Sequence, residues 1–187
     1  MIDTFDKTIL AWFQSIQNDT ATGFLSILTK LGEAGLLWIV AGLLMLIFIK
    51  EKKYGVIVLL SLLLCLIFGN VLLKNLVARP RPCHHPHEYI MLISIPRDYS
   101  FPSGHTFSSV AATIGIGYWN RKWGMAAAVV TVLMMFSRLY FYVHYPTDIL
   151  GGIVLGTVLA FLSIGIVEKT LADERWKNWR NKRRHER

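Results

Sequence analysis

The chain has 187 residues, of which 53% are hydrophobic and 17% charged, and its formal net charge is +8. Soluble domains carry about 25% charged residues. The low charge and the long apolar runs exclude an ordinary soluble fold, because a soluble helical core would need many adjacent helices that are apolar on every face. The length predicts one domain. The cysteines, Cys65 in an apolar run and Cys83 in a loop, do not form a disulfide framework.

The N-terminal section, residues 1–33, is only partly apolar. In residues 3–17 apolar side chains recur at three- and four-residue steps, which predicts an amphipathic helix. Residues 21–31 are apolar but short. We expect this section to lie on the membrane surface or to dip into it. The alternative is a sixth, poorly hydrophobic span.

Five uncharged runs follow, and each predicts a transmembrane helix. They cover residues 35–49, 54–73, 104–119, 123–137 and 149–167. The second run has about the 20 residues that a helix needs to cross a bilayer. The fold class expected is therefore all-α, a polytopic membrane helical bundle. Its single domain covers residues 1–168, with a motif-bearing core at 35–168 and a basic tail at 169–187.

The basic residues of the connections predict the orientation of the bundle. Lysine and arginine are concentrated in the turns at 50–53 and 121–122 and in the tail 169–187, which alternating spans place on one side. By the positive-inside rule this side is the cytoplasm. The loop 74–101 and the stretch 137–148 then lie on the extracytoplasmic face. The basic tail is explained by topology and by anionic lipids, so no nucleic-acid partner is expected.

Cations suited to a phosphate group are found at three helix ends on the outer face. Lys74, Arg81 and Arg138 together match a phosphate dianion, and arginine adds bidentate donation. Ser103 has the features of a helix N-cap. The backbone N–H groups of the following residue Gly104 and its neighbour then point at the same anion.

Two histidines remain to carry out chemistry. His144 and Asp148 are four residues apart with Pro146 between them, and proline suits the first turn of a helix. A carboxylate that holds one ring N–H leaves the other ring nitrogen as a nucleophile. His105 suits protonation of the leaving oxygen. These residues predict attack of His144 on phosphorus, a phosphohistidine, and its hydrolysis by water that His105 activates.

These three stretches resemble the three-part signature of the type-2 phosphatidic acid phosphatase superfamily. The matching residues are Lys74 with Arg81-Pro82, then Pro102-Ser103-Gly104-His105, then Ser137-Arg138 with His144 and Asp148. The resemblance implies a phosphatase that needs no metal or other cofactor. It implies His144 as the nucleophile, Asp148 as its partner and His105 as the acid and base. It also implies that Lys74, Arg81, Ser103, Gly104 and Arg138 hold the phosphate.

We expect two further polar features to have no role in catalysis. Arg79 offers another cation, and we read it as a solvated loop residue. His84, His85 and His87 look like metal ligands, but zinc needs three or four ligands in fixed geometry and nothing else in the chain completes such a site. Headgroup contact or a plain loop is the expected role of these histidines.

A site at the membrane surface favours a lipid whose phosphate stays at headgroup level. The resemblance suggests undecaprenyl diphosphate first and phosphatidylglycerophosphate or phosphatidate second, and the sequence does not separate them. A haloperoxidase would require a soluble chain. The rival class is a non-enzymatic membrane protein, such as a transporter, that binds an anion at these cations. The expected partners are the lipid phosphate and membrane lipids, with no oligomeric state predicted.

Overall fold

The structure is a computed structural model. It describes the backbone of residues 2–84 and 92–185 and the side chains of residues 4–84 and 92–174. All regular secondary structure in these ranges is helical. The elements are α1 (Ile2–Ser15), α2 (Asp19–Leu31), η1 (Glu33–Gly35), α3 (Leu36–Phe48), α4 (Lys53–Leu64), η2 (Cys65–Leu73), α5 (Lys74–Val77), η3 (Pro82–His84), α6 (Gly104–Trp119), α7 (Arg121–Tyr140) and α8 (Pro146–His185).

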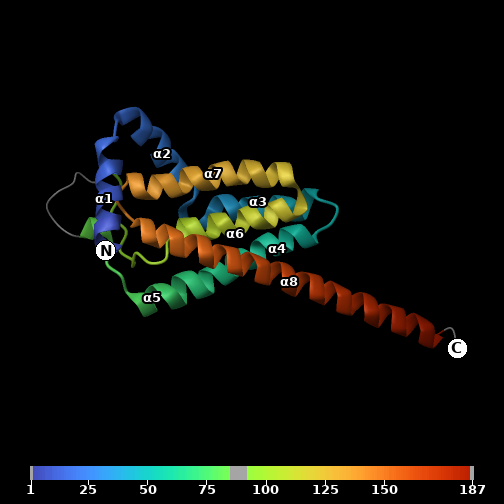
Figure 1. The fold of residues 1–187 in the computed structure, drawn as a ribbon. Helices are drawn as coiled ribbons and strands as arrows, with labels where there is room; N and C mark the ends of the chain where they lie inside the picture. The colour runs from blue at the N-terminus through green and yellow to red at the C-terminus, as the bar shows by residue number, and fades with distance from the viewer. Residues whose placement is uncertain (1, 85–91, 186–187) are drawn as a thin grey trace.

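Helix α6 is the centre of the bundle, and it packs against α3, α4, α7 and α8 (Figure 1). Its buried face is built largely from small residues, including Ser109, Ala111, Ala112 and Gly115. Small side chains let the neighbouring helix backbones approach closely. At Gly156 of α8, an added Cβ would lie 2.5 Å from the carbonyl oxygen of Phe107. The backbones of α6 and α8 therefore lie in direct contact at this point.

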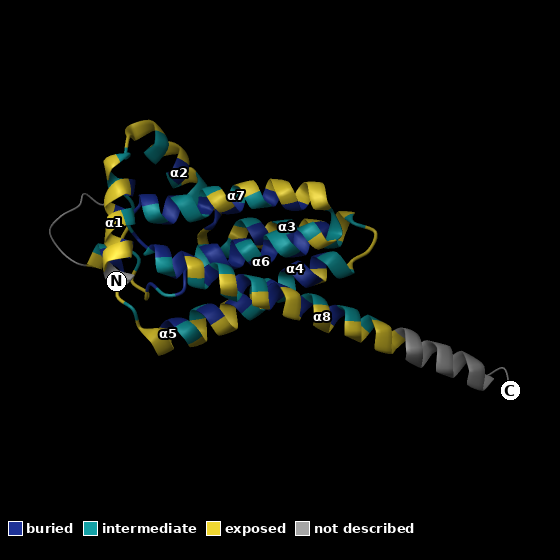
Figure 2. Ribbon diagram, viewed as in Figure 1, coloured by how far each residue is buried: buried dark blue, intermediate teal, exposed yellow. Residues whose placement is uncertain are grey.

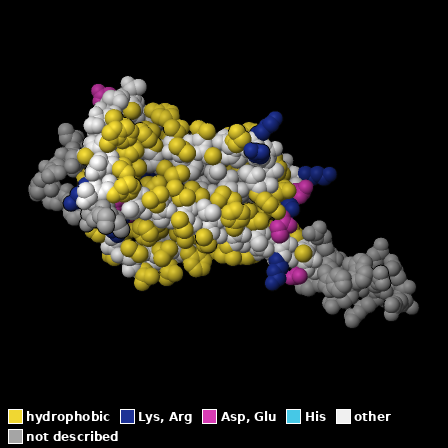
Figure 3. Space-filling model, in the orientation of Figure 1, with side chains coloured by type: hydrophobic (Ala, Val, Ile, Leu, Met, Phe, Trp, Pro, Cys, Tyr) yellow, Lys and Arg dark blue, Asp and Glu magenta, His cyan; other side chains and the backbone are white. Residues whose placement is uncertain are grey.

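The outer flank of the bundle is apolar. Figure 2 shows exposed residues along the outer helix faces, and Figure 3 shows that hydrophobic side chains cover them. Leu76, Val154 and Phe161, for example, are between 62% and 75% exposed. In the same view lysine and arginine gather at one end of the bundle, near the α3–α4 and α6–α7 turns. An apolar flank with charged ends is typical of a protein embedded in a bilayer.

The number of spans differs from the five expected. Among the described residues, three helical segments are long and apolar enough to cross a membrane: Lys53–Val77, Arg121–Tyr140 and Pro146–Glu174. The helices α3 and α6, with 13 and 16 residues, are too short to do so alone. The polar motif at the start of α6 shortens its apolar run. The all-helical membrane fold is confirmed, but the count of five is not.

The N-terminal section is divided differently from the expectation. Helix α1 is amphipathic and lies across one end of the bundle, as Figure 1 shows. Helix α2 instead forms a pair with α3 that is bent by 46°. Together the two helices are long and apolar enough to form a broken span or a re-entrant segment. Ala34 and Gly35, with φ angles of 52° and 72°, make the bend between the two helices. The sequence pattern grouped residues 21–31 with α1, whereas the structure joins them to the next apolar run, α3.

At the other end of the chain, α8 continues to His185 without a break. The basic tail expected from residue 169 is therefore a continuation of helix α8 as far as residue 185. Figure 1 shows this part extending beyond the rest of the bundle.

A π-helical stretch, η2, interrupts the span Lys53–Val77 just before the first polar motif. Such stretches often occur at functional sites. Gly69 makes room there, because an added Cβ would lie 2.5 Å from the ring of the buried Phe107. The stretch ends at Leu73, and the next residue, Lys74, is only 6% exposed.

Two glycines of α8 test the close packing of the central helix. Gly156→Ala should destabilise the protein by about 1–3 kcal/mol, because the new methyl group meets the backbone of α6. Gly165→Ala, with no atom within 4 Å of the new Cβ, should be neutral or stabilising. Thermal unfolding of both variants in one detergent compares them, and equal melting temperatures would contradict this packing.

Candidate active site

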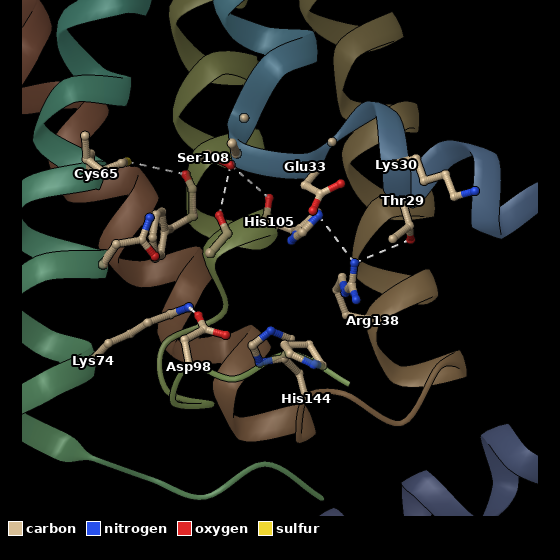
Figure 4. A pocket seen from close by; sticks show the side chains of 18 of the residues that line it. Thr29, Lys30, Glu33, Cys65, Lys74, Asp98, His105, Ser108, Arg138 and His144 are labelled. Carbon is tan, nitrogen blue, oxygen red and sulfur yellow. Dashed lines mark hydrogen bonds and ion pairs between the residues drawn. The ribbon is translucent and has the colours of Figure 1, made fainter. Parts of the chain in front are cut away.

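The three predicted polar stretches meet at one end of the bundle, around a cavity of about 1350 Å³ (Figure 4). Lys74 begins α5, and Arg81 lies in the loop that follows. His105 comes from the first turn of α6, Arg138 from the last turn of α7, and His144 from the α7–α8 loop. All five residues line the cavity. Residues separated by up to 70 positions in the sequence therefore face one space.

The two ring nitrogens of His144 face opposite charges. Its Nε2 lies 2.9 Å from Nη1 of Arg81, and its Nδ1 lies 3.4 Å from a carboxylate oxygen of Asp148. Arginine can only donate, so Nε2 is the acceptor and the proton of the neutral ring belongs on Nδ1. Burial, followed by the cations Arg81 and Arg138, outweighs the effect of Asp148 and lowers the pKa of His144 to about 3. The imidazole is therefore neutral at physiological pH.

Asp148 lies behind His144 and is fully buried. Helix α8 begins at Pro146, as predicted, and this places the carboxylate one turn from the histidine. Asp148 accepts hydrogen bonds from the backbone N–H of Tyr145 at 2.8 Å, from the hydroxyl of Ser100 and from Arg79 at 2.7 Å. These donors hold the carboxylate in its ionised form and fix its position.

Arg138 and His105 form a second pair, across the cavity from Lys74 in Figure 4. Nη1 of Arg138 lies 3.3 Å from Nε2 of His105 and 3.4 Å from the hydroxyl of Thr29. Arg138 is 3% exposed, and its Nε is a buried donor that has no hydrogen-bond partner among the residues that the structure describes. A buried, unsatisfied N–H is costly unless a further group binds there. It marks a place for an acceptor oxygen in the cavity.

Ser103 and Gly104 occupy the start of α6, as predicted. Ser103 takes the N-cap position, but its side chain makes no capping bond and instead accepts from the hydroxyl of Thr106 at 3.0 Å. Its backbone N–H donates to the carbonyl of Asp148 at 3.2 Å, which ties the second motif to the third. Gly104 lines the cavity, whereas Ser103 is buried behind it.

Sequence reasoning missed Asp98, an acidic residue of the loop before α6. Its carboxylate binds Lys74 and lies 2.8 Å from Nη2 of Arg81. Burial opposes its ionisation, but the bond to Lys74 and the charge of Arg81 prevail and lower the pKa of Asp98 to about 2. No motif marked this residue, because its role depends on how the loop returns to the cavity.

Sequence reasoning was wrong about Arg79, which is not a solvated loop residue. Its guanidinium lies 2.7 Å from Asp148 and 2.8 Å from Asp6 of α1, and it stacks over the ring of Tyr145. Asp6 is 1% exposed and also accepts from the N–H and hydroxyl of Thr147. The amphipathic helix α1 is thereby tied to the start of α8. The sequence pattern assigned Asp6 to the polar positions of the amphipathic helix, so it gave no signal for this contact.

The histidine-rich loop contributes little that the structure describes. Nε2 of His84 bonds the carbonyl of Pro96 at 2.9 Å, while His85 and His87 lie outside the described residues. Within the described part of the chain, no group of three His, Cys, Asp or Glu side chains is arranged to hold a metal ion.

Comparison with known proteins identifies the family. The family model of the PAP2 superfamily matches residues 54–171. The chain belongs to the PAP2 superfamily. The family predicted from the three motifs is thus confirmed, and the chain is a phosphatase.

Several PAP2 relatives are similar over much of their length. An undecaprenyl-diphosphatase of Sulfolobus acidocaldarius is 32% identical over 79% of this chain and 71% of its own. A phosphatidylglycerophosphatase B of Bacillus subtilis is 35% identical over 58% of this chain and 59% of its own. The chain thus spans less than two thirds of the second relative.

Solved structures agree with the fold. A transmembrane PAP2-type phosphatidylglycerolphosphate phosphatase from Bacillus subtilis has a TM-score of 0.71 at 28% identity, covering 90% of this chain and 87% of its own. The LpxE protein of Aquifex aeolicus also has a TM-score of 0.71, at 21% identity. It covers 86% of this chain and 94% of its own, and it supports the fold alone.

The tie between α1 and the site can be tested at Asp6. Asp6→Ala should destabilise the protein by about 3 kcal/mol, because it leaves the partly buried Arg79 with one partner fewer. Asp19→Ala, which removes an exposed carboxylate from the first turn of α2, should cost less than about 1 kcal/mol. Thermal unfolding in detergent measures both, and an equal loss would contradict a special role for Asp6.

Proposed function

We propose that this protein hydrolyses a membrane lipid phosphate or diphosphate through a phosphohistidine intermediate, without a metal ion. The observation that carries the proposal is a single cavity whose one side presents buried cations and a neutral histidine and whose other side is apolar. The apolar lining comes from α3 and α4–η2 and includes Ile39, Leu59, Leu62, Leu63 and Leu66. A phosphate can bind at the cations while its lipid chain stays among these helices.

The cations provide the binding energy for the phosphate. Lys74, Arg81 and Arg138 surround the space in front of His144, and the unsatisfied Nε of Arg138 offers a donor to a phosphate oxygen. The N-terminus of α6 at Gly104 adds backbone donors. Positive groups around the equatorial oxygens stabilise the charge that develops in phosphoryl transfer.

His144 is the proposed nucleophile. The bound phosphate takes over Nη1 of Arg81 as its donor, and this frees the lone pair of Nε2. The lone pair then attacks phosphorus, a P–N bond forms, and the bond from phosphorus to the leaving oxygen breaks. Nδ1 keeps its proton, and the Asp148 carboxylate beside it stabilises the positive ring. His105 lies on the opposite wall beside Arg138, whose charge favours a neutral ring in the free enzyme. The dianionic substrate offsets this charge, so His105 takes up a proton as the substrate binds and then donates it to the leaving oxygen.

Water completes the reaction in the second step. His105, now neutral, takes a proton from a water molecule as that water attacks the phosphohistidine. The P–N bond breaks, inorganic phosphate leaves and His144 returns to its neutral form. Both steps are proton-balanced, since the proton that His105 gives in the first step is regained in the second.

Among lipid phosphates, undecaprenyl diphosphate is the proposed substrate. A diphosphate offers a terminal phosphate with about two negative charges, and its long prenyl chain suits the apolar side of the cavity. The name of the Sulfolobus acidocaldarius relative supports this choice. The phosphatidylglycerophosphatases of Bacillus subtilis favour the alternative, a glycerolipid phosphate such as phosphatidylglycerophosphate or phosphatidate.

The proposed function can be tested with the purified protein in detergent. Wild-type protein should release phosphate from undecaprenyl diphosphate faster than from phosphatidate or phosphatidylglycerophosphate, and chelators should not reduce the rate. His144→Ala should lower the rate by at least about 1,000-fold, since covalent catalysis ends. Brief reaction with substrate labelled at the terminal phosphate, followed by alkaline denaturation, should leave label on wild-type protein.

Three results would contradict the proposal. A fully active His144→Ala variant would exclude this nucleophile. Loss of activity in EDTA that zinc or magnesium restores would indicate a metal-dependent reaction. Absence of hydrolysis with every lipid phosphate would favour an anion-binding protein without catalysis.

We also propose that the cavity opens on the extracytoplasmic face and that the C-terminal end of α8 is cytoplasmic. The positive-inside rule supports this, because the basic turns follow the ends of α3 and α6, whereas the first residues of α6 line the cavity. In a Cys83→Ser background, Tyr99→Cys should react with a membrane-impermeant maleimide in intact cells. Lys52→Cys, in the α3–α4 turn, should react only after lysis. The reverse pattern would invert the orientation.

A further inference from the structure

The span Lys53–Val77 contains a polar residue, Asn70, that the proposed reaction does not use. It lies in the otherwise apolar stretch η2, whose sequence is Cys-Leu-Ile-Phe-Gly-Asn-Val-Leu-Leu. A polar side chain within a membrane helix is costly unless it faces a cavity or a polar partner. Asn70 lines the cavity of the candidate active site. Its position therefore indicates a contact with a bound ligand.

Asn70 stands at the boundary between the charged and the apolar parts of the cavity. Four residues of this span line the cavity at intervals of four positions: Leu62, Leu66, Asn70 and Lys74. Residues four positions apart lie on the same face of a helix, about 6 Å from one another. This face therefore changes from a cation to a neutral amide and then to leucine. A lipid phosphate bound along it would place its phosphate end at Lys74 and its chain at the two leucines.

The carboxamide of Asn70 also reaches the start of α6. A Cβ built on Gly104, the first residue of α6, would lie 3.4 Å from Oδ1 of Asn70 and 3.8 Å from Nζ of Lys74. Figure 4 shows Lys74 reaching from its helix toward Asp98, beside His144. Within the described residues the carboxamide of Asn70 makes no hydrogen bond, whereas the nearby Asn75 donates to the carbonyl of Val71 at 2.7 Å. The amide donors of Asn70 are therefore available to a ligand.

We propose that Asn70 is a further substrate-binding residue, whose amide N–H groups donate to the inner phosphate of a prenyl diphosphate. The inference rests on the proposed function, in which the terminal phosphate binds at the cations and is attacked by His144. The inner phosphate is joined to the terminal phosphate through a single bridging oxygen and leads to the prenyl chain. It therefore falls between Lys74 and Leu66, where the carboxamide lies.

A neutral donor suits this position for an electrostatic reason. The inner phosphate carries one negative charge, which a carboxylate would repel. A fourth cation would add to the mutual repulsion of Lys74, Arg81 and Arg138, which are all nearly buried. An amide donates to the charged oxygen without adding a charge of its own. Such charge-assisted hydrogen bonds are stronger than those between neutral groups.

The contact distinguishes a diphosphate from a monophosphate with the same chain. When the phosphate of a prenyl monophosphate binds at the three cations, its first methylene group faces Asn70 and accepts no hydrogen bond. A purely structural role makes a different prediction. If Asn70 served only to pack against the start of α6, its replacement would weaken the binding of both compounds by the same factor. The ratio of their two inhibition constants therefore separates the roles.

The test compares farnesyl diphosphate with farnesyl monophosphate as competing ligands in detergent. Each is added to an assay that follows the conversion of the best lipid phosphate found for the wild type into its dephosphorylated lipid. In Asn70→Leu the inhibition constant of the diphosphate should rise at least about tenfold, because a bond to a charged oxygen is lost. That of the monophosphate should rise less than about threefold. The control Asn75→Leu, whose amide is bonded to its own helix, should keep the wild-type ratio.

The outcomes separate this inference from the proposed function. A wild-type protein that hydrolyses no lipid phosphate would overturn both. An active wild type together with an unchanged ratio in Asn70→Leu would overturn the inference alone, whether both constants rise by one factor or neither rises. Asn70→Ala provides a second variant without the amide. If neither variant folds, as judged by thermal unfolding in detergent, Asn70 is structural and the inference is wrong.

Discussion

The structure depends on the burial of three like charges at one end of an apolar bundle. Lys74, Arg81 and Arg138 are each 6% exposed or less, and desolvated cations repel one another strongly unless anions or hydrogen-bond acceptors surround them. The fold supplies one carboxylate, Asp98, to the first two cations and no carboxylate partner to the third within the described contacts. Such a site retains an affinity for a further anion.

The same excess of positive charge sets the protonation state of His144, the proposed nucleophile. His144 is buried beside Arg81, and protonation would place a fourth positive charge in the cluster. The ring therefore stays neutral and keeps a lone pair on Nε2, while the Asp148 carboxylate lies 3.4 Å from the other ring nitrogen. Binding of an anion and activation of the histidine thus have one electrostatic origin. Arg79 extends this arrangement outward, since it contacts the other carboxylate oxygen of Asp148 and is itself bound to Asp6.

The membrane gives the site its orientation toward lipids. The cavity is bounded by cations on one side and by leucine side chains of α4 and η2 on the other. A soluble phosphate ester could satisfy the cations alone, whereas a lipid phosphate also satisfies the apolar side.

The sequence by itself determined the membrane class, the family and the set of motif residues. Hydropathy fixes which segments enter a bilayer, and the spacing of Lys74, Arg81, His105, Arg138 and His144 is local enough to recognise. The start of α8 at Pro146 followed from proline chemistry in the same way. Only the tertiary structure decided the rest. The bent α2–α3 pair depends on two residues with positive φ. Asp6, Arg79 and Asp98 gained their roles through contacts across 17 to 73 positions of sequence, which no periodicity records. A charged residue in a loop has the same sequence pattern whether water or a buried partner neutralises it, and the folded chain alone distinguishes the two.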